Sequence, residues 1–154
     1  MVTPKLTEEQ KILSMSRRTI AIAAALSVLA LGSPLITANA NPLARQYFDQ
    51  GLEKYEAGNY QGAIDDYTKA IEINPQNAIA YNNRGIARFK LGDYQGSSAD
   101  YTKAIENDTS QSAAYLNRGL NRERAADLEG ACDDWRKAVE LGNRRPAEWV
   151  KNQC

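Results

Sequence analysis

One heptapeptide recurs in this chain at a fixed distance, and that spacing restricts what the chain can fold into. The segment DYTKAIE occupies 66–72 and returns at 100–106, and a looser copy, DWRKAVE, occupies 134–140, so each copy begins 34 residues after the last. A period of roughly 20–50 residues is the signature of repeat architectures. Residues that recur in every copy are then expected to be those that stack one copy on the next.

The columns that repeat at this period describe a unit of two packed helices. Glycine recurs in the first half of each copy and a small residue follows twelve positions later, so two helices can approach closely there. The recurring residues are Tyr47, Tyr81 and Tyr115, then Gly51, Gly85 and Gly119, then Ala63, Ser97 and Ala131, and last Tyr67, Tyr101 and Trp135. With stop and cap residues such as Gly58 and Asn59, the pattern predicts helices at about 43–57, 60–73, 78–91, 94–107, 112–125 and 128–141.

This set of columns resembles the tetratricopeptide repeat (TPR) family. The matching residues are Tyr47, Gly51, Gly58, Tyr60, Ala63, Tyr67, Ala70 and Pro75 in the first copy, Tyr81, Gly85, Gly92, Tyr94, Tyr101 and Ala104 in the second, and Tyr115, Gly119, Ala131, Trp135 and Ala138 in the third. The resemblance implies an all-α fold, a right-handed α-solenoid of three helix-turn-helix repeats at about 44–77, 78–111 and 112–143. Ser97, where alanine is usual, and Ala126, where glycine is usual between the helices, depart from the family pattern.

The last residues of the chain are predicted to cover the end of the array. Pro146 favours the first turn of a helix, and an array needs a terminal helix over its last apolar surface, so we expect a capping helix at 146–153. If this helix runs antiparallel to the one at 128–141, Cys132 and Cys154 come close enough to form a disulfide. Two buried free thiols are the alternative. An oxidising compartment favours the bond, which would stabilise the fold by roughly 3 kcal/mol.

The first forty residues differ in composition from the rest of the chain. A pair of arginines, Arg17 and Arg18, precedes an apolar run at 20–31, and the small residues of a cleavage motif follow at 38–40. This order is typical of a secretory signal peptide at 1–40, cut between Ala40 and Asn41. It predicts a protein exported to the periplasm, another extracytoplasmic lumen or the medium, with one domain at 41–154. An uncleaved membrane anchor at 19–36 is the alternative, although its apolar core is shorter than the roughly 20 residues of a span.

The absence of histidine and the balanced charge narrow the function. The 154 residues hold 19 Lys and Arg, 19 Asp and Glu, and no His. Without histidine, neither a Ser-His or Cys-His nucleophile nor a His-ligated metal site can form, and we expect no enzyme, no cofactor and no metal centre. Nucleic-acid binding would require an uncompensated basic patch, which this charge balance does not supply. We therefore expect a protein or peptide partner.

Arginine recurs one residue before the glycine of the second and third copies. Arg84 and Arg118 each lie sixteen residues before an aspartate, Asp100 and Asp134. Because partly buried arginine is usually paired, we expect ion pairs inside each copy rather than a basic surface. The lysine of each heptapeptide is expected on the solvent face, with weak pairing to the aspartate three residues before it.

The resemblance to TPR arrays implies a ligand groove along the first helices of the copies. The residues that it places there are Phe48, Leu52, Tyr55, Asn82, Asn83, Ile86, Phe89, Lys90, Leu116, Asn117, Leu120 and Arg124. Asn83 and Asn117 occupy columns where family members often hold the ligand's backbone, and an amide side chain can donate and accept together. For Leu52, Ile86 and Leu120, packing between copies is an equal alternative. Some TPR co-chaperones grip a terminal carboxylate with five polar residues, and of those columns only Asn83 agrees here.

These features predict an exported interaction module that binds a peptide or a partner protein in its groove. An enzyme would need a cluster of acidic, basic or hydroxyl side chains in a pocket, and no such motif is present. A structural or assembly subunit of a larger complex, acting without binding free peptide, is the alternative.

Overall fold

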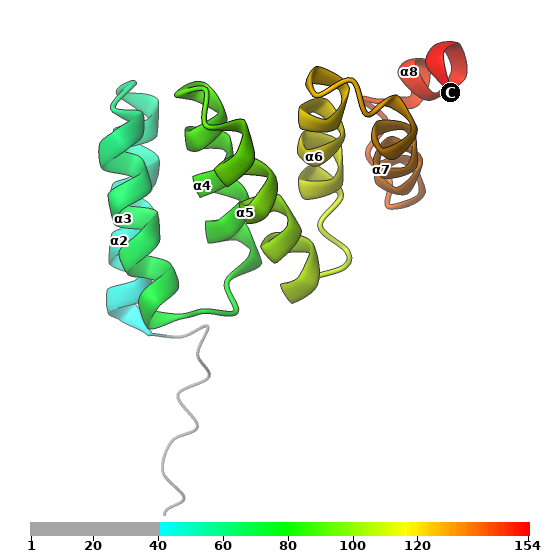
Figure 1. Ribbon diagram of the computed structural model, residues 1–154. Helices are drawn as coiled ribbons and strands as arrows, with labels where there is room; N and C mark the ends of the chain where they lie inside the picture. The colour runs from blue at the N-terminus through cyan, green and yellow to red at the C-terminus, as the bar shows by residue number, and fades with distance from the viewer. Residues whose placement is uncertain (1–40) are drawn as a thin grey trace, which may run out of the picture. The chain divides into compact units, whose positions relative to one another are not determined.

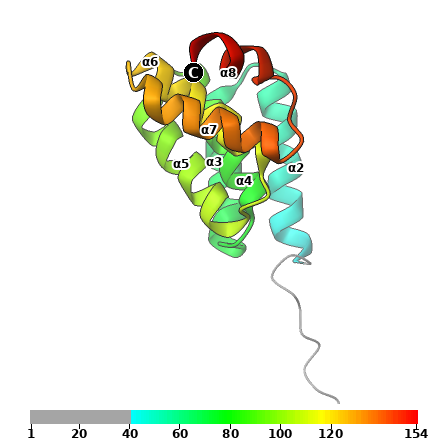
Figure 2. The ribbon, with the colours of Figure 1, turned by 90° about the vertical axis from the view of Figure 1, so that its right-hand side faces the viewer.

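The protein is a row of paired helices. A computed structural model describes residues 41–154, and within that range the chain forms no β-strand. The helices are α2 (Pro42–Glu56), α3 (Tyr60–Ile73), α4 (Ala78–Lys90), α5 (Tyr94–Asn107), α6 (Ser112–Arg124), α7 (Leu128–Glu140) and α8 (Ala147–Gln153). Figures 1 and 2 show the pairs α2/α3, α4/α5 and α6/α7 following one another in chain order, with α8 after α7. The all-α prediction is confirmed, and the signal peptide predicted at 1–40 lies outside the described residues.

Each second helix begins at a side chain that caps it. Asn59, Asp93 and Asp127 each accept a hydrogen bond from the backbone N–H three residues further on, at 2.9–3.0 Å. The first N–H groups of a helix have no partner inside the helix, so such a bond stabilises its start. Local residues thus determine where α3, α5 and α7 begin.

An aromatic ring fills the space that glycine leaves between the two helices of a copy. A Cβ added to Gly51 would lie 2.7 Å from the ring of Tyr67, and one added to Gly85 would lie 2.7 Å from the ring of Tyr101. Tyr67, Tyr101 and Trp135, which takes this place in the third copy, are 0–2% exposed. A side chain at the glycine column would therefore force the helices apart or displace the ring.

The middle copy adds a hydrogen bond at this crossing. The Oγ of Ser97 donates to the backbone carbonyl oxygen of Gly85 at 2.8 Å, and both residues are buried. The other two copies have Ala63 and Ala131 in the serine column, and a methyl group contributes contact without a hydrogen bond. The buried serine hydroxyl thus has its partner on the facing helix, as a buried polar group requires.

A buried aspartate on each second helix binds cations from the first helix of its copy. In the second copy, Arg84 donates from Nη2 to Asp100 Oδ1 at 2.7 Å and from Nε to Oδ2 at 2.9 Å, and Arg88 donates from Nη1 to Oδ2 at 2.8 Å. The Asp100 side chain is only 3% exposed. In the third copy, Arg118 pairs with Asp134 at the same 2.7 Å. The ion pairs predicted inside these copies are present, and their two-pronged geometry fixes the helices in one register.

The first copy binds its aspartate with lysine instead. Asp66 Oδ2 lies 2.5 Å from Lys54 Nζ, and its Oδ1 lies 3.3 Å from Lys69 Nζ. Burial by itself raises the pKa of Asp66, but the hydrogen bonds and charges of the two lysines outweigh it and hold the pKa below 3.8. In the other copies the heptapeptide lysine binds a glutamate three residues on, Glu106 at 2.6 Å and Glu140 at 3.0 Å. The predicted lysine–aspartate pair therefore occurs only in the first copy, because two arginines already occupy the aspartate in the others.

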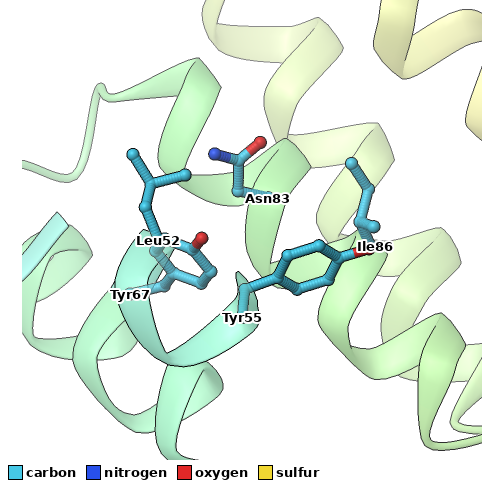
Figure 3. A pocket seen from close by; sticks show the side chains of 5 residues that line it. All are labelled: Leu52, Tyr55, Tyr67, Asn83 and Ile86. Atoms are coloured by element: carbon cyan, nitrogen blue, oxygen red, sulfur yellow. The ribbon is translucent and has the colours of Figure 1, made fainter. Parts of the chain in front are cut away.

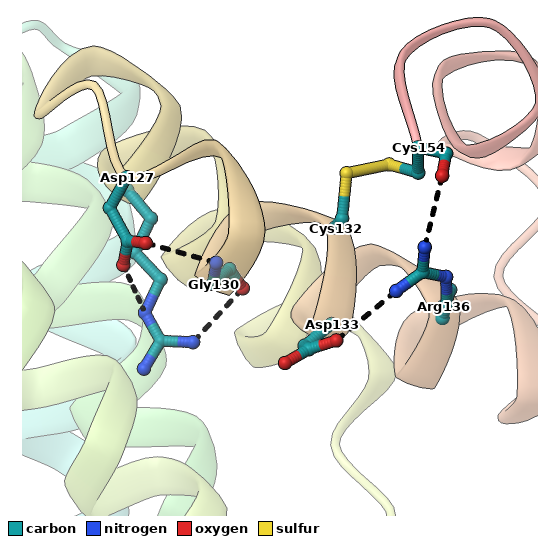
Figure 4. The surroundings of a disulfide bond; sticks show 7 residues. Asp127, Gly130, Cys132, Asp133, Arg136 and Cys154 are labelled. Atoms are coloured by element: carbon teal, nitrogen blue, oxygen red, sulfur yellow. Dashed lines mark hydrogen bonds and ion pairs between the residues drawn. A yellow bond between two sulfur atoms is a disulfide. The ribbon is translucent and has the colours of Figure 1, made fainter.

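The last helix packs on α7 and is joined to it covalently. The ring centroids of Trp149 on α8 and Trp135 on α7 lie 5.3 Å apart, and Pro146 at the start of the segment is buried. Cys132 on α7 and Cys154 form a disulfide, with their Cα atoms 5.6 Å apart (Figure 4). The terminal segment thus covers the apolar surface that the α6/α7 pair leaves at the end of the row.

Arg136 binds the same end of the chain from the side. Its Nη2 donates to the backbone carbonyl oxygen of Cys154 at 3.2 Å, and its Nη1 donates to Asp133 Oδ1 at 3.2 Å (Figure 4). Arg136 stands in the heptapeptide column where the other copies have threonine. The sequence difference in the third heptapeptide is thus explained by the contact it makes.

The turn between the helices of the third copy carries backbone strain that the other turns avoid. Gly58 and Gly92 adopt φ of 77° and 82°, and Ala126 adopts φ of 62° in the same column. A left-handed conformation costs a residue with a Cβ about 1–2 kcal/mol. Ala126→Gly should therefore raise the free energy of unfolding by about 1 kcal/mol, measured by urea denaturation.

The adjacent alanine provides the matched control for this substitution. Ala125 has φ of −82°, where alanine is unstrained, so Ala125→Gly should leave stability unchanged or lower it. Equal changes in the two variants would contradict a strain at Ala126.

Candidate peptide-binding pocket

Three consecutive helices supply the walls of one small pocket. Leu52 and Tyr55 come from α2, Tyr67 from α3, and Asn83 and Ile86 from α4, and together they enclose about 110 Å³. Figure 3 shows these side chains converging, with the ring of Tyr55 extending toward Ile86. The turn at 74–77 places α4 beside α3, so the pocket exists only because the second copy stacks on the first.

The pocket is mostly apolar, with one amide, Asn83, and two phenols, Tyr55 and Tyr67, in its wall. Asn82 Nδ2 donates to Asn83 Oδ1 at 3.4 Å. Burial raises the pKa of Tyr67 to about 12, and the nearby Asn83 amide opposes that rise. The five lining residues thus carry no charge at neutral pH. An apolar side chain and a backbone amide are the groups that such a pocket can hold.

The amides of α4 and α6 form a short chain of hydrogen bonds. Asn117 Nδ2 donates to Asn82 Oδ1 at 3.1 Å, and Asn82 in turn donates to Asn83. Each of these two amides has a partner inside the protein, but Asn83 lines the pocket and Asn117 does not. The two asparagines, which the sequence placed in equivalent columns, therefore have different roles.

Several other residues expected in the groove contribute to packing. Asn82 and Leu116 are only 6% and 5% exposed, so burial leaves them little surface for a ligand, contrary to expectation. Phe48 stacks on Tyr67 with ring centroids 5.7 Å apart. Leu120 packs against the buried cluster that includes Trp135. For Leu120 the packing alternative thus fits the structure, while Leu52 and Ile86 both pack and face the pocket.

The remaining predicted residues lie near the turns between first and second helices. Lys90 and Arg124 are exposed, and Phe89 lies under the guanidinium of Arg124, whose Cζ is 5.0 Å from the ring centroid. None of these three belongs to the pocket wall.

Tyr67 is the wall residue that the sequence did not place in the site. Its column was interpreted as packing, because it recurs with Tyr101 and Trp135 opposite the glycines, and that interpretation is also right. No sequence signal separates Tyr67 from the equivalent tyrosine, because Tyr101 has Asn117 sixteen residues later just as Tyr67 has Asn83.

No metal centre or membrane span is visible in the described part of the chain. Residues 41–154 contain no group of three or more Cys, Asp or Glu that could hold a metal ion. Within the same residues, no helix combines the length and the hydropathy that a membrane span requires.

Comparison with known proteins identifies the repeats. A family profile described as "TPR repeat" matches residues 51–92, and another described as "Tetratricopeptide repeat" matches residues 78–111. The TPR domain of Arabidopsis OM64 is 31% identical and superposes with a TM-score of 0.68, over 71% of this chain and 92% of that domain. The chain belongs to the tetratricopeptide repeat family.

Other TPR structures similar to this one carry peptides. The second TPR domain of human RPAP3, in complex with the HSP70 peptide SGPTIEEVD, is 31% identical with a TM-score of 0.66, over 71% of this chain and 92% of that one. The first TPR of Spaghetti (RPAP3), bound to the HSP90 peptide SRMEEVD, is 28% identical with a TM-score of 0.68, over 71% of this chain and 89% of that one. By family and by these neighbours, the protein is a protein-interaction module.

A curated relative shares a shorter segment. The tetratricopeptide repeat protein 36 homolog of Nematostella vectensis is 50% identical over 40 residues, which are 26% of this chain and 22% of that protein. The matched segment thus spans about a fifth of that relative, and it adds to the family assignment alone.

Burial of two tyrosines should make the fold sensitive to alkaline pH. Burial raises the pKa of Tyr67 and of Tyr101 to about 12, above the ordinary value of 10.0. Because the unfolded chain ionises first, the free energy of unfolding should hold below about pH 10 and fall as the pH rises from 10 toward 12. Urea denaturation between pH 10 and 12 should show that Tyr67→Phe loses less of its free energy of unfolding than the wild type does. Identical losses would mean that the Tyr67 phenol is not responsible.

Proposed function

We propose that this TPR protein binds a partly apolar peptide segment of a partner protein, without an acidic tail, along its first helices. The observation that carries the proposal is the open pocket of Leu52, Tyr55, Tyr67, Asn83 and Ile86, which has apolar walls and one amide. An apolar side chain of the ligand would enter the pocket, while the Asn83 amide would hydrogen-bond the ligand's backbone. Both contacts suit an extended segment and neither depends on charge.

The ligand proposed here differs from the chaperone peptides of the similar structures. Those peptides end in the acidic sequence EEVD. The five columns that hold a terminal carboxylate in some TPR co-chaperones are occupied here by Phe48, Leu52, Asn83, Ala113 and Asn117. These side chains are apolar or neutral, so an acidic tail would lose its hydration without gaining a cation. We therefore place this protein among TPR modules that read an apolar segment.

Two peptides, one neutral with blocked ends and one acidic with a free carboxylate, test the pocket directly. Titration of the ¹⁵N-labelled protein with the neutral pentapeptide Ac-SLALS-NH₂ should shift the amide signals of Leu52, Tyr55, Asn83 and Ile86 and reach saturation. The acidic peptide SRMEEVD should give no saturable shift at the same residues. Asn83→Ala should weaken the neutral peptide by about fivefold, the value of one lost hydrogen bond of about 1 kcal/mol.

Asn117→Ala is the matched control, because Asn117 has the same side chain in the equivalent column but is not part of the pocket wall. It should leave the affinity for the neutral peptide within about twofold of the wild type, since no ligand bond is removed. An unchanged affinity in Asn83→Ala, or tighter binding of SRMEEVD, would overturn the proposal. A protein that forms oligomers by light scattering and ignores both peptides would instead act as an assembly subunit.

We further propose that the protein is exported and that residues 1–40 are removed. Support comes from the arginine pair, apolar run and small-residue motif of the sequence, and from the Cys132–Cys154 disulfide, since such bonds persist in oxidising compartments. A cut before Asn41 would also spare the start of α2, where Asn41 Oδ1 accepts a hydrogen bond from the N–H of Leu43 at 3.0 Å.

Mass spectrometry of the protein isolated from its own cells, without reductant, tests both parts of this proposal. The expected species begins at Asn41 and takes up no alkylating reagent at cysteine. A chain that retains residues 19–36 would instead support the membrane anchor. Two alkylated cysteines would show that the bond does not form in the cell.

A further inference from the structure

Two copies of the repeat carry a pair of aromatic rings where the first helix ends and the second begins. Tyr55 and Tyr60 lie with ring centroids 5.3 Å apart, and Phe89 and Tyr94 lie 5.3 Å apart in the same two columns of the next copy. The third copy has glutamate and leucine in these columns. Only the first two copies therefore offer a pair of ring faces at this place among residues 41–154.

In the second copy, an arginine of the chain occupies the pair. The Cζ of Arg124 lies 5.0 Å from the centroid of Phe89 and 5.5 Å from that of Tyr94. Its Nη1 also donates to the Tyr94 hydroxyl at 3.4 Å. A guanidinium is planar and weakly hydrated, so it stacks on aromatic faces at a low desolvation cost. The contact of Arg124 thus shows that a guanidinium fits against a pair of rings in this arrangement.

In the first copy, the corresponding residue leaves the pair open. Lys90 stands 34 residues before Arg124 and is exposed. Within residues 41–154 no cation lies over Tyr55 or Tyr60, and Lys90 has neither a ring contact nor an ion pair. Lysine in this column makes no contact with the rings, whereas arginine does. The rings of Tyr55 and Tyr60 are half-buried against the cluster of Ala63, Tyr67 and Ala87, and no cation of the described chain covers the rest of their faces.

The open pair is continuous with the peptide-binding pocket. Tyr55 belongs to both, since one part of its side chain lines the pocket and its ring packs against Tyr60. The next residue, Glu56, is exposed and has no ion-pair partner in the described part of the chain. Its charge is the smallest of the causes that raise the pKa of Tyr67, after burial and the neighbouring Tyr55. A carboxylate beside an open pair of rings favours a cation there.

We propose that the Tyr55–Tyr60 pair binds an arginine side chain of the partner, next to the residue whose apolar side chain enters the pocket. The inference rests on the proposed peptide-binding function and specifies the ligand further, as an apolar segment that carries an arginine. The bound guanidinium would take the place at Tyr55 and Tyr60 that Arg124 takes at Phe89 and Tyr94.

Three pentapeptides that differ at one residue test this inference. They are Ac-SLXLS-NH₂ with arginine, lysine or citrulline at X, titrated into the ¹⁵N-labelled protein. Citrulline has the shape of arginine without its charge. The arginine peptide should bind about two- to fivefold more tightly than the citrulline peptide, which is the range of an exposed cation–π contact, with lysine between them. Its additional shifts should appear at Tyr55 and Tyr60.

The test variants copy residues that the third repeat has in the same columns. Tyr60→Leu installs the leucine that the third copy has in this column, and it should reduce the arginine-to-citrulline ratio to about one. Lys90→Arg installs the arginine that the third copy has, and its guanidinium should occupy the pair and reduce the same ratio. Tyr94→Leu removes a ring from the pair that Arg124 already occupies, so the ratio should stay as in the wild type.

The outcomes separate the arginine site from the pocket. Equal affinities for the three peptides, with shifts at Leu52, Asn83 and Ile86, would leave the pocket standing and overturn the arginine site. A ratio that survives both Tyr60→Leu and Lys90→Arg would also overturn it. If no peptide binds, N-acetyl-arginine amide decides: shifts at Tyr55 and Tyr60 would support the arginine site while the pocket fails, and their absence would overturn both.

Discussion

The rest of the array depends on the ion pairs that the buried aspartate of each second helix forms with cations of the first helix. Asp100 receives three hydrogen bonds from Arg84 and Arg88, at 2.7–2.9 Å. A carboxylate removed from water costs several kcal/mol unless cations and hydrogen bonds compensate it, and loss of one partner from a buried pair typically costs about 3–5 kcal/mol. The first and second helices of a copy therefore have one low-energy register. This register also fixes the positions of the pocket residues that the first helices carry.

The same arginine also joins one copy to the copy before it. Arg84 Nη1 donates to Thr68 Oγ1 at 3.1 Å, and Arg118 Nη1 donates to Thr102 Oγ1 at 3.2 Å. Both threonines belong to the repeated heptapeptide. One guanidinium thus binds the aspartate of its own copy and the threonine of the previous one. This contact explains why the heptapeptide retains threonine in the first two copies.

The fold was predictable because its determinants are local and periodic. The crossing of two helices is set by Gly51 and Gly85, each of which is followed by a tyrosine sixteen residues later. This spacing can be read from the sequence alone. The pairing of Lys54 with Asp66 was not predicted, although Lys54 stands in the column of Arg88 and Arg122, which bind the aspartates of the other copies. The glutamate partners of Lys103 and Lys137 were not predicted either, because competition for one carboxylate is a property of the packed structure.

The site was only partly predictable, because the columns of a repeat do not distinguish facing a groove from packing against a neighbour. Leu52, Tyr55, Asn83 and Ile86 were named from their columns and meet at the pocket. Asn82 and Leu116 were named on the same grounds and are buried. Asn117 is equivalent to Asn83 in sequence, but it does not line the pocket. Which asparagine reaches the pocket is set by how the copies stack.

The serine at 97 has a mechanical consequence. Its hydroxyl binds the Gly85 carbonyl across the crossing of α4 and α5, whereas the first and third copies have only an alanine methyl there. A directional bond resists sliding of one helix along the other, and van der Waals contact resists it less. The crossing of α4 and α5 should therefore resist sliding more than the α2/α3 and α6/α7 crossings.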